Sequence, residues 1–169
     1  LANAAGNFVC PAEKLSPNGW KAVVDIVLNG TFYCCSAFGR RMIEAHAADG
    51  RKRSLVTVVA DYAWGAGPGV IHSAAAKAGV LALTRTLAVE WARHGIRANA
   101  VSPGPFRSEG TDRNLWLDEA LAKEIVDSIP LRRYTTAEEV AETIAFLADE
   151  EKAGYVTGAC LPVDGGHWL

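Results

Sequence analysis

The segment LVTVVA, residues 55–60, constrains the fold more than any other stretch of the chain. It is almost entirely apolar and rich in β-branched side chains, without the alternation of polar and apolar residues that marks a strand with one wet face. Such a run is typical of a strand that is buried on both faces. A sheet of this kind needs helices on each side, so the segment favours an α/β fold.

The rest of the chain alternates helix and strand patterns around this segment. Ser16-Pro17 is an N-cap followed by proline at the first helical position, Gly95 is a C-cap, and Thr135 with Glu138 forms a capping-box pattern. We expect helices at 17–48, 73–93, within 114–127 and at 135–148, and strands at 55–60, 96–102 and 159–163. The alternation predicts parallel strands with ligands beyond their carboxyl ends, in one domain spanning residues 1–169.

Charge and hydrophobicity exclude several classes of function. The 169 residues carry 17 Lys and Arg against 19 Asp and Glu, a net charge of −2, with no basic run. This balance argues against nucleic acid or an anionic membrane as partner. No apolar run approaches the ~20 residues of a membrane span, and no leader opens the chain, so we expect a cytoplasmic protein without membrane contact.

Cysteines and histidines show no ligand spacing. Cys34 and Cys35 are adjacent while Cys10 and Cys160 are isolated, and the four histidines are scattered. These spacings match neither a disulfide framework nor a zinc site. We expect apolar fillers at the cysteines and no bound metal.

Residues that could take part in catalysis or binding lie at three expected strand ends. The segment 3–8 carries two asparagines among small residues, Tyr62 follows LVTVVA, and 103–106 is a rigid Pro-Gly-Pro-Phe turn. In the helix after Tyr62, Ser73 and Lys77 are four residues apart and share one face. Each feature has a purely structural explanation when taken alone: a tight turn for the segments 3–8 and 103–106, a half-buried aromatic for Tyr62, and a surface pair for Ser73 and Lys77. Because they share one edge of the expected sheet, together they indicate a ligand-binding or catalytic site.

Five blocks in order resemble the later two-thirds of a short-chain dehydrogenase/reductase. They are NAAG at 3–6, LNGT at 28–31, SAAAKAG at 73–79, GIRANAVSPGP at 95–105 and VDGG at 163–166. Within that family, AAGNFVCPAEKLSPNGWKAVVDIVLNGT and a tyrosine fifteen residues before Lys77 are similar to the 2,4-dienoyl-CoA reductases. The resemblance implies a Rossmann-like doubly wound parallel sheet that lacks its first βαβαβ portion.

One position departs from the larger family. Ser73 stands where most members carry the tyrosine of a Tyr-x-x-x-Lys pattern, and the resemblance implies that Tyr62 supplies the phenol instead. Reduction of a dienoyl thioester builds negative charge on the thioester oxygen, and Tyr62 with Asn7 is implied as its two-donor oxyanion site. Lys77 is implied to hold the nicotinamide ribose, Ser73 to join the same hydrogen-bond network, and Asn29 to support the lysine through a helix kink.

The resemblance also implies ligand-binding residues. The cofactor, NADPH with NADH as an alternative, is expected to contact Lys77 and the two small-residue turns, namely Asn3, Ala4, Ala5, Gly6, Pro103, Gly104, Pro105 and Phe106. The acyl-CoA substrate is expected at Phe8, Ser16 and Arg113, an arginine fork being suited to a CoA phosphate. Ser16 as a plain N-cap and Arg113 as a solvated surface side chain are the alternatives.

The glycine-rich turn that binds pyrophosphate in this family has no counterpart in the sequence, which leads us to expect that the chain starts at the fourth strand. Two other functions therefore stay open: a reductase of a 3-oxoacyl or alcohol substrate, and a cofactor-incompetent fragment acting only in oligomer assembly. We expect a homo-oligomer, a dimer or homotetramer, because Gly79 and the alanine-rich helix 73–93 offer small-residue faces and family members commonly pair these helices.

Overall fold

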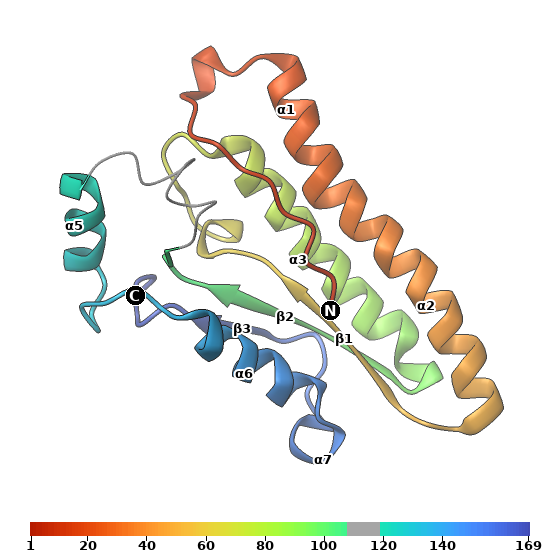
Figure 1. The fold of residues 1–169 in the computed structure, drawn as a ribbon. Helices are drawn as coiled ribbons and strands as arrows, with labels where there is room; N and C mark the ends of the chain where they lie inside the picture. The colour runs from red at the N-terminus through yellow and green to blue at the C-terminus, as the bar shows by residue number, and fades with distance from the viewer. Residues whose placement is uncertain (108–118) are drawn as a thin grey trace.

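The computed structural model describes residues 1–107 and 119–169, and its core is a three-stranded parallel sheet (Figure 1). The strands β1 (Arg53–Val58), β2 (Ile96–Pro103) and β3 (Cys160–Val163) lie in the order β1-β2-β3. On the free edge of β1, Ala2 forms a single parallel bridge to Thr57, with its N–H 2.8 Å from the Val56 carbonyl. The expected parallel α/β fold is confirmed.

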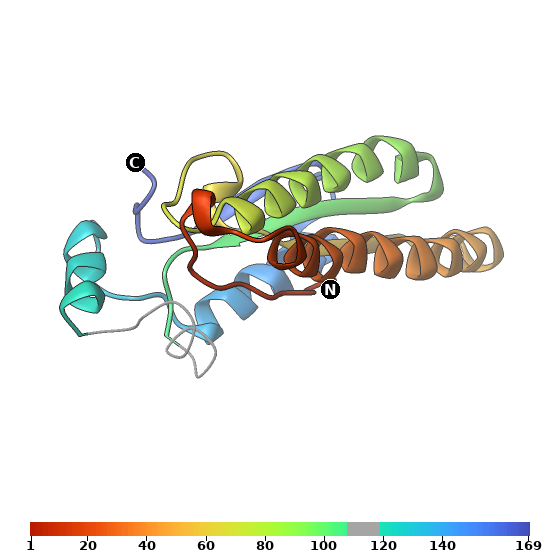
Figure 2. The same ribbon diagram turned by 90° about the horizontal axis from the view of Figure 1, so that it is seen from above.

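Helices cover both faces of the sheet, as Figures 1 and 2 show from two directions. On one face of the sheet, Leu55 and Ala98 pack with Cys35 of helix 30–49 and Ala88 of helix 71–91. On the other face, Val56 and Val101 pack with Leu147 of helix 137–148. Neighbouring residues of β1 thus point to opposite faces, and both faces are buried. The helices are α1 (Pro17–Val24), α2 (Gly30–Asp49), α3 (Ile71–Trp91), α5 (Glu119–Ser128), α6 (Ala137–Ala148) and α7 (Glu150–Ala153), with 3₁₀ turns at Ala12–Lys14, Asp61–Ala63 and Ala92–His94.

The first long helix begins as expected and contains an unexpected turn. Ser16 caps it by accepting a hydrogen bond from the Gly19 N–H at 3.1 Å, with Pro17 following. Between α1 and α2, residues Asp25–Asn29 form a π-helical turn, so the segment is one continuous helix with a local widening. It ends at Gly50 in the left-handed conformation, φ 66°.

This helical segment bears on the expectation that no stretch of the chain is long and apolar enough to span a membrane. Among the described residues, Pro17–Asp49 is long and apolar enough to cross a membrane by length and composition alone. Core helices of water-soluble proteins meet the same criterion, and this helix buries Val23, Val27 and Cys35. Only 28% of its most apolar part is buried within the described residues, so packing inside this fold accounts for a minor part of its apolar composition.

The capping box of α6 is shifted by one residue from the expected position. The Thr136 Oγ1 accepts from the Glu139 N–H at 3.2 Å, and the Glu139 carboxylate accepts from the Thr136 N–H at 2.9 Å. The prediction of Thr135 with Glu138 was wrong. Thr135 is instead extended and forms a bridge with Phe106, so its backbone is used before the helix begins.

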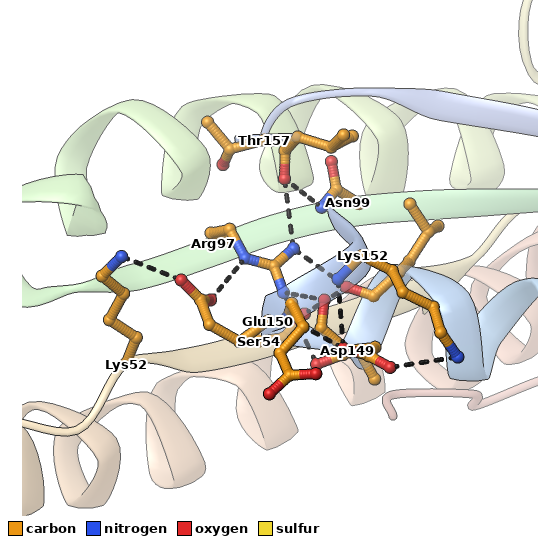
Figure 3. A network of polar contacts seen from close by, with 12 residues as sticks. Lys52, Ser54, Arg97, Asn99, Asp149, Glu150, Lys152 and Thr157 are labelled. Carbon is orange, nitrogen blue, oxygen red and sulfur yellow. Dashed lines mark hydrogen bonds and ion pairs between the residues drawn. The ribbon is translucent and has the colours of Figure 1, made fainter. Parts of the chain in front are cut away.

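At the amino end of β2, a buried arginine joins the sheet to the turn between α6 and α7 (Figure 3). Arg97 donates to the Leu147 carbonyl at 2.9 Å and to the Glu150 carboxylate at 3.2 Å, and Glu150 also pairs with Lys52. Asn99 donates to the Val156 carbonyl at 2.9 Å. These bonds satisfy backbone carbonyls at the end of the sheet away from the strand carboxyl ends, which marks them as structural.

Candidate active site

Three residues from three separate segments meet at the carboxyl end of β1. The phenol oxygen of Tyr62, on the 3₁₀ turn after β1, accepts a hydrogen bond from Asn7 Nδ2 at 3.3 Å and lies 3.1 Å from Ser73 Oγ. Asn7 Oδ1 accepts from the Phe8 N–H at 2.9 Å, which fixes the amide with its donor toward Tyr62. The structure therefore brings together Asn7, Tyr62 and Ser73.

The environment keeps the Tyr62 phenol protonated at neutral pH. Burial raises the pKa of Tyr62, and the hydrogen bond with Ser73 acts in the opposite direction. Because the neutral phenol keeps its proton, it can donate a hydrogen bond to a further acceptor.

Lys77 lies one helical turn beyond Ser73 on the buried side of α3. Its Nζ donates to the Val58 carbonyl at the end of β1, at 2.7 Å. Burial lowers the pKa of Lys77 to about 8, because the ammonium loses hydration. At neutral pH the side chain is still mostly a cation, held at the carboxyl edge of the sheet.

Asn29 is half-buried in an apolar helix and has a hydrogen-bond partner there. Its Nδ2 donates to Asp25 Oδ1 at 2.8 Å across the π-helical turn. Asn29 does not join the hydrogen bonds of Tyr62, and its supporting role toward Lys77 stays a prediction.

The two turns assigned to the cofactor flank this group. The segment from Asn3 to Gly6 follows the Ala2 bridge, and that from Pro103 to Phe106 begins at the last residue of β2. Gly104 donates to the Val163 carbonyl at 2.9 Å, and a Cβ at this position would lie 2.6 Å from Asp164 Cα. Glycine is therefore required for this close approach. The cofactor contacts themselves stay predictions.

The residues assigned to the acyl-CoA have different surroundings. Phe8 packs edge-on against His72, with ring centroids 4.4 Å apart, and Ser16 serves as the N-cap of α1. The structure thus shows the alternative role of Ser16, while its contact with substrate stays a prediction. Arg113 lies outside the described residues.

Sequence reasoning missed Asp61 and His167. Asp61 Oδ1 accepts from the Tyr62 N–H at 2.8 Å, and His167 Nδ1 lies 2.9 Å from Asp61 Oδ2. The two are 106 residues apart, so no local spacing relates them. The sequence did offer one indication, because both residues follow a strand. Asp61 precedes Tyr62 after β1, and His167 follows Gly165 and Gly166 after β3.

The cysteines are thiols, and burial raises the pKa of both Cys35 and Cys160 to about 11. Neither is therefore a thiolate nucleophile at neutral pH. Within residues 1–107 and 119–169, no three His, Cys, Asp or Glu side chains are grouped to hold a metal ion.

A sequence model of the family described as enoyl-(acyl carrier protein) reductase matches residues 1–167. The chain belongs to the short-chain dehydrogenase/reductase family. As a member of this family, it has the expected partial Rossmann fold, confirmed by the strand order, by the helices on both faces and by solved structures of the same fold.

Named relatives are close in sequence. A probable 2,4-dienoyl-CoA reductase [(2E)-enoyl-CoA-producing] of Bacillus subtilis is 54% identical over the whole chain, which spans 65% of that relative. A short chain dehydrogenase of Bacillus anthracis is 53% identical with a TM-score of 0.85, over 99% of this chain and 63% of the other. A gluconate 5-dehydrogenase of Burkholderia cenocepacia, in complex with NADP and tartrate, is 29% identical with a TM-score of 0.89, over 97% of this chain and 62% of the other.

Proposed function

We propose that the protein reduces 2,4-dienoyl-CoA thioesters to enoyl-CoA with NADPH as the reductant, in the β-oxidation of unsaturated fatty acids. The observation that carries the proposal is the pair of potential donors on the Tyr62 phenol oxygen. Asn7 donates to one lone pair, and Ser73 can donate to the other, because either hydroxyl in that pair can be the donor. With both lone pairs accepting, the phenol proton is free for a third group.

The thioester oxygen of a dienoyl-CoA is a suitable acceptor for the phenol proton of Tyr62. Reduction at the far end of the conjugated chain moves negative charge to the thioester oxygen, as a dienolate, and one proton is then taken up by the carbon chain. Tyr62 donates its phenol proton in a hydrogen bond to that oxygen, and Asn7 offers the second proton of its Nδ2. Donors that are positioned before the charge forms stabilise the transition state without reorganising.

Lys77 and its surroundings fit a nicotinamide cofactor. Its ammonium has three protons, and Val58 accepts one of them, which leaves two donors for hydroxyl groups of a ribose. When bound, NADPH supplies the hydride. The solved relative in complex with NADP and the named dienoyl-CoA reductase support both the cofactor and the substrate class.

Self-association and a cytoplasmic location are part of the proposal. A groove of about 240 Å³ between α2 and α3 is lined by Phe32, Leu87 and Trp91, with Arg40 and Glu90 also in its lining. It offers a second copy a surface that combines aromatic and charged side chains. Of the small residues of α3, Gly79 packs against Leu28 within the chain, whereas Ala75, Ala78 and Ala82 are exposed.

The decisive assay follows NADPH oxidation by the purified full-length protein with 2,4-hexadienoyl-CoA and, in parallel, with a 3-oxoacyl-CoA. We expect turnover of the dienoyl thioester and little of the ketone. A reversed preference would replace the proposal by carbonyl reduction, and failure to bind NADPH would favour a role in assembly alone. The same assay with NADH measures the preference between the two cofactors.

A further inference from the structure

The carboxylate of Asp61 links the catalytic loop to the segment after β3. Asp61 is 9% exposed, and both of its oxygens are used: Oδ1 accepts from the Tyr62 N–H at 2.8 Å, and Oδ2 lies 2.9 Å from His167 Nδ1. A buried carboxylate without such partners would be costly. The pairing therefore holds the Tyr62 backbone and His167 in one arrangement.

His167 is presented by a turn that Asp164 organises. The Asp164 carboxylate accepts from the Gly166 N–H at 2.9 Å and from the Trp168 N–H at 3.3 Å. Gly165 and Gly166 have φ of 63° and 82°, a region that favours glycine. These bonds fix the direction in which His167 leaves β3.

A second contact anchors the other side of the Tyr62 loop. The Trp168 ring lies directly on Gly65, where an added Cβ would come within 1.5 Å of the ring, and it meets Trp64 edge-on at 6.5 Å between centroids. Figure 2 shows the C-terminal segment and the loop after β1 at the same end of the sheet. The residues before and after Tyr62 are thus both tied to this segment.

We propose that His167 is a positioning residue, which acts through Asp61 to hold the Tyr62 phenol where it donates to the substrate oxygen. The inference rests on the proposed function for the identity of that substrate. A donor hydrogen bond to a developing charge depends on placement to within a fraction of an ångström, and a displacement of about 1 Å can cost ~10²-fold in rate. His167 itself contacts neither Asn7 nor Ser73 in the hydrogen bonds of the site.

The kinetic test uses the full-length protein with three substitutions at two histidines. His167→Ala should lower kcat with 2,4-hexadienoyl-CoA by ~10- to 10²-fold while KM changes little. His167→Asn, which keeps a nitrogen donor at the reach of Nδ1, should recover most of the loss. His94→Ala, in the 3₁₀ turn beyond the carboxyl end of α3, is the matched control and should leave kcat unchanged.

A double-mutant cycle separates positioning from a general loss of stability. In the Tyr62→Phe background, His167→Ala should cause no further loss of kcat, because the group that it positions is gone. An equal fold-loss in both backgrounds would overturn the proposal, as would a kcat for His167→Ala equal to that of the control.

A spectroscopic measurement keeps this inference separate from the proposed function. With 3-fluorotyrosine incorporated, the ¹⁹F signal of Tyr62 is the one that Tyr62→Phe removes. His167→Ala should shift or broaden it, and His94→Ala should not. A moved signal in a protein that does not reduce dienoyl-CoA would reject the function and keep the positioning; an unmoved signal in an active protein would reject the positioning alone.

Discussion

At the scale of single residues, burial acts in opposite directions on the two ionisable groups of the site. It raises the pKa of the Tyr62 phenol and lowers the pKa of the Lys77 ammonium to about 8, because the charged form of each is the more costly one to bury. Both protons are therefore present at neutral pH. The site offers an uncharged donor and a cation, both at the carboxyl end of β1.

Lys77 gives a prediction for stability. Its pKa in the folded chain, about 8, is below the ordinary value of 10.5, so between these values the unfolded chain binds more protons and stability rises with pH. Below pH 8 the full cost of burying the charge is present. Lys77→Met should thus raise the free energy of unfolding at pH 7 by about 1–3 kcal/mol and remove the rise toward pH 10.

Urea unfolding at several pH values measures this effect, with Lys123→Met, an exposed lysine in α5, as the control. The control should keep the wild-type dependence on pH. If the free energy of unfolding of Lys77→Met depended on pH as that of the wild type does, burial of this ammonium would have no net cost. The pKa of Lys77 would then give no reason to assign this residue a role in the site.

At the scale of helices, capping decides where an element begins. Residues 135–139 contain two overlapping capping patterns, Thr135 with Glu138 and Thr136 with Glu139, and the sequence alone does not choose between them. The choice is made by tertiary contacts, since Thr135 pairs with Phe106 and Arg133 pairs with Glu139. The same limit applies to the π-helical turn, which local helix propensity does not predict.

The observed cap predicts a difference between two adjacent threonines. Thr136→Ala should lower the free energy of unfolding by about 0.5–2 kcal/mol, because a helix N–H loses its acceptor. Thr135→Ala should cost less, since its backbone bridge is retained. Chemical denaturation of the two variants makes the comparison, and a larger loss at Thr135 would contradict the assigned cap.

At the scale of the whole molecule, the sequence predicted the parallel layers and the residues at the strand ends. The alternating patterns were sufficient because β1 and β2 are buried between helices on both faces of the sheet. The resemblance implied that Asn7, Tyr62 and Ser73 act together, and the structure brings them together at the shared sheet edge. The Asp61–His167 pair did not, because a contact across 106 residues depends on the path of the chain after β3.

Association of the whole molecule can be tested at the groove between α2 and α3. Phe32 lines this groove and is half exposed, so Phe32→Glu would place a charge in the proposed interface. We expect a dimer or tetramer for the wild type by light scattering and a smaller species for Phe32→Glu. Tyr155→Glu, at a fully exposed aromatic in another part of the fold, should associate as the wild type does. An unchanged mass for Phe32→Glu would place any interface elsewhere.

The account depends most on Tyr62 as the donor to the thioester oxygen, and a single substitution tests this directly. Tyr62→Phe removes the phenol proton and keeps the ring, so kcat for 2,4-hexadienoyl-CoA should fall by ~10²–10³-fold, while Ser73→Ala should retain more activity. The measurement is NADPH oxidation by the purified full-length variants. Activity that survives in Tyr62→Phe and is lost in Ser73→Ala would contradict the assignment.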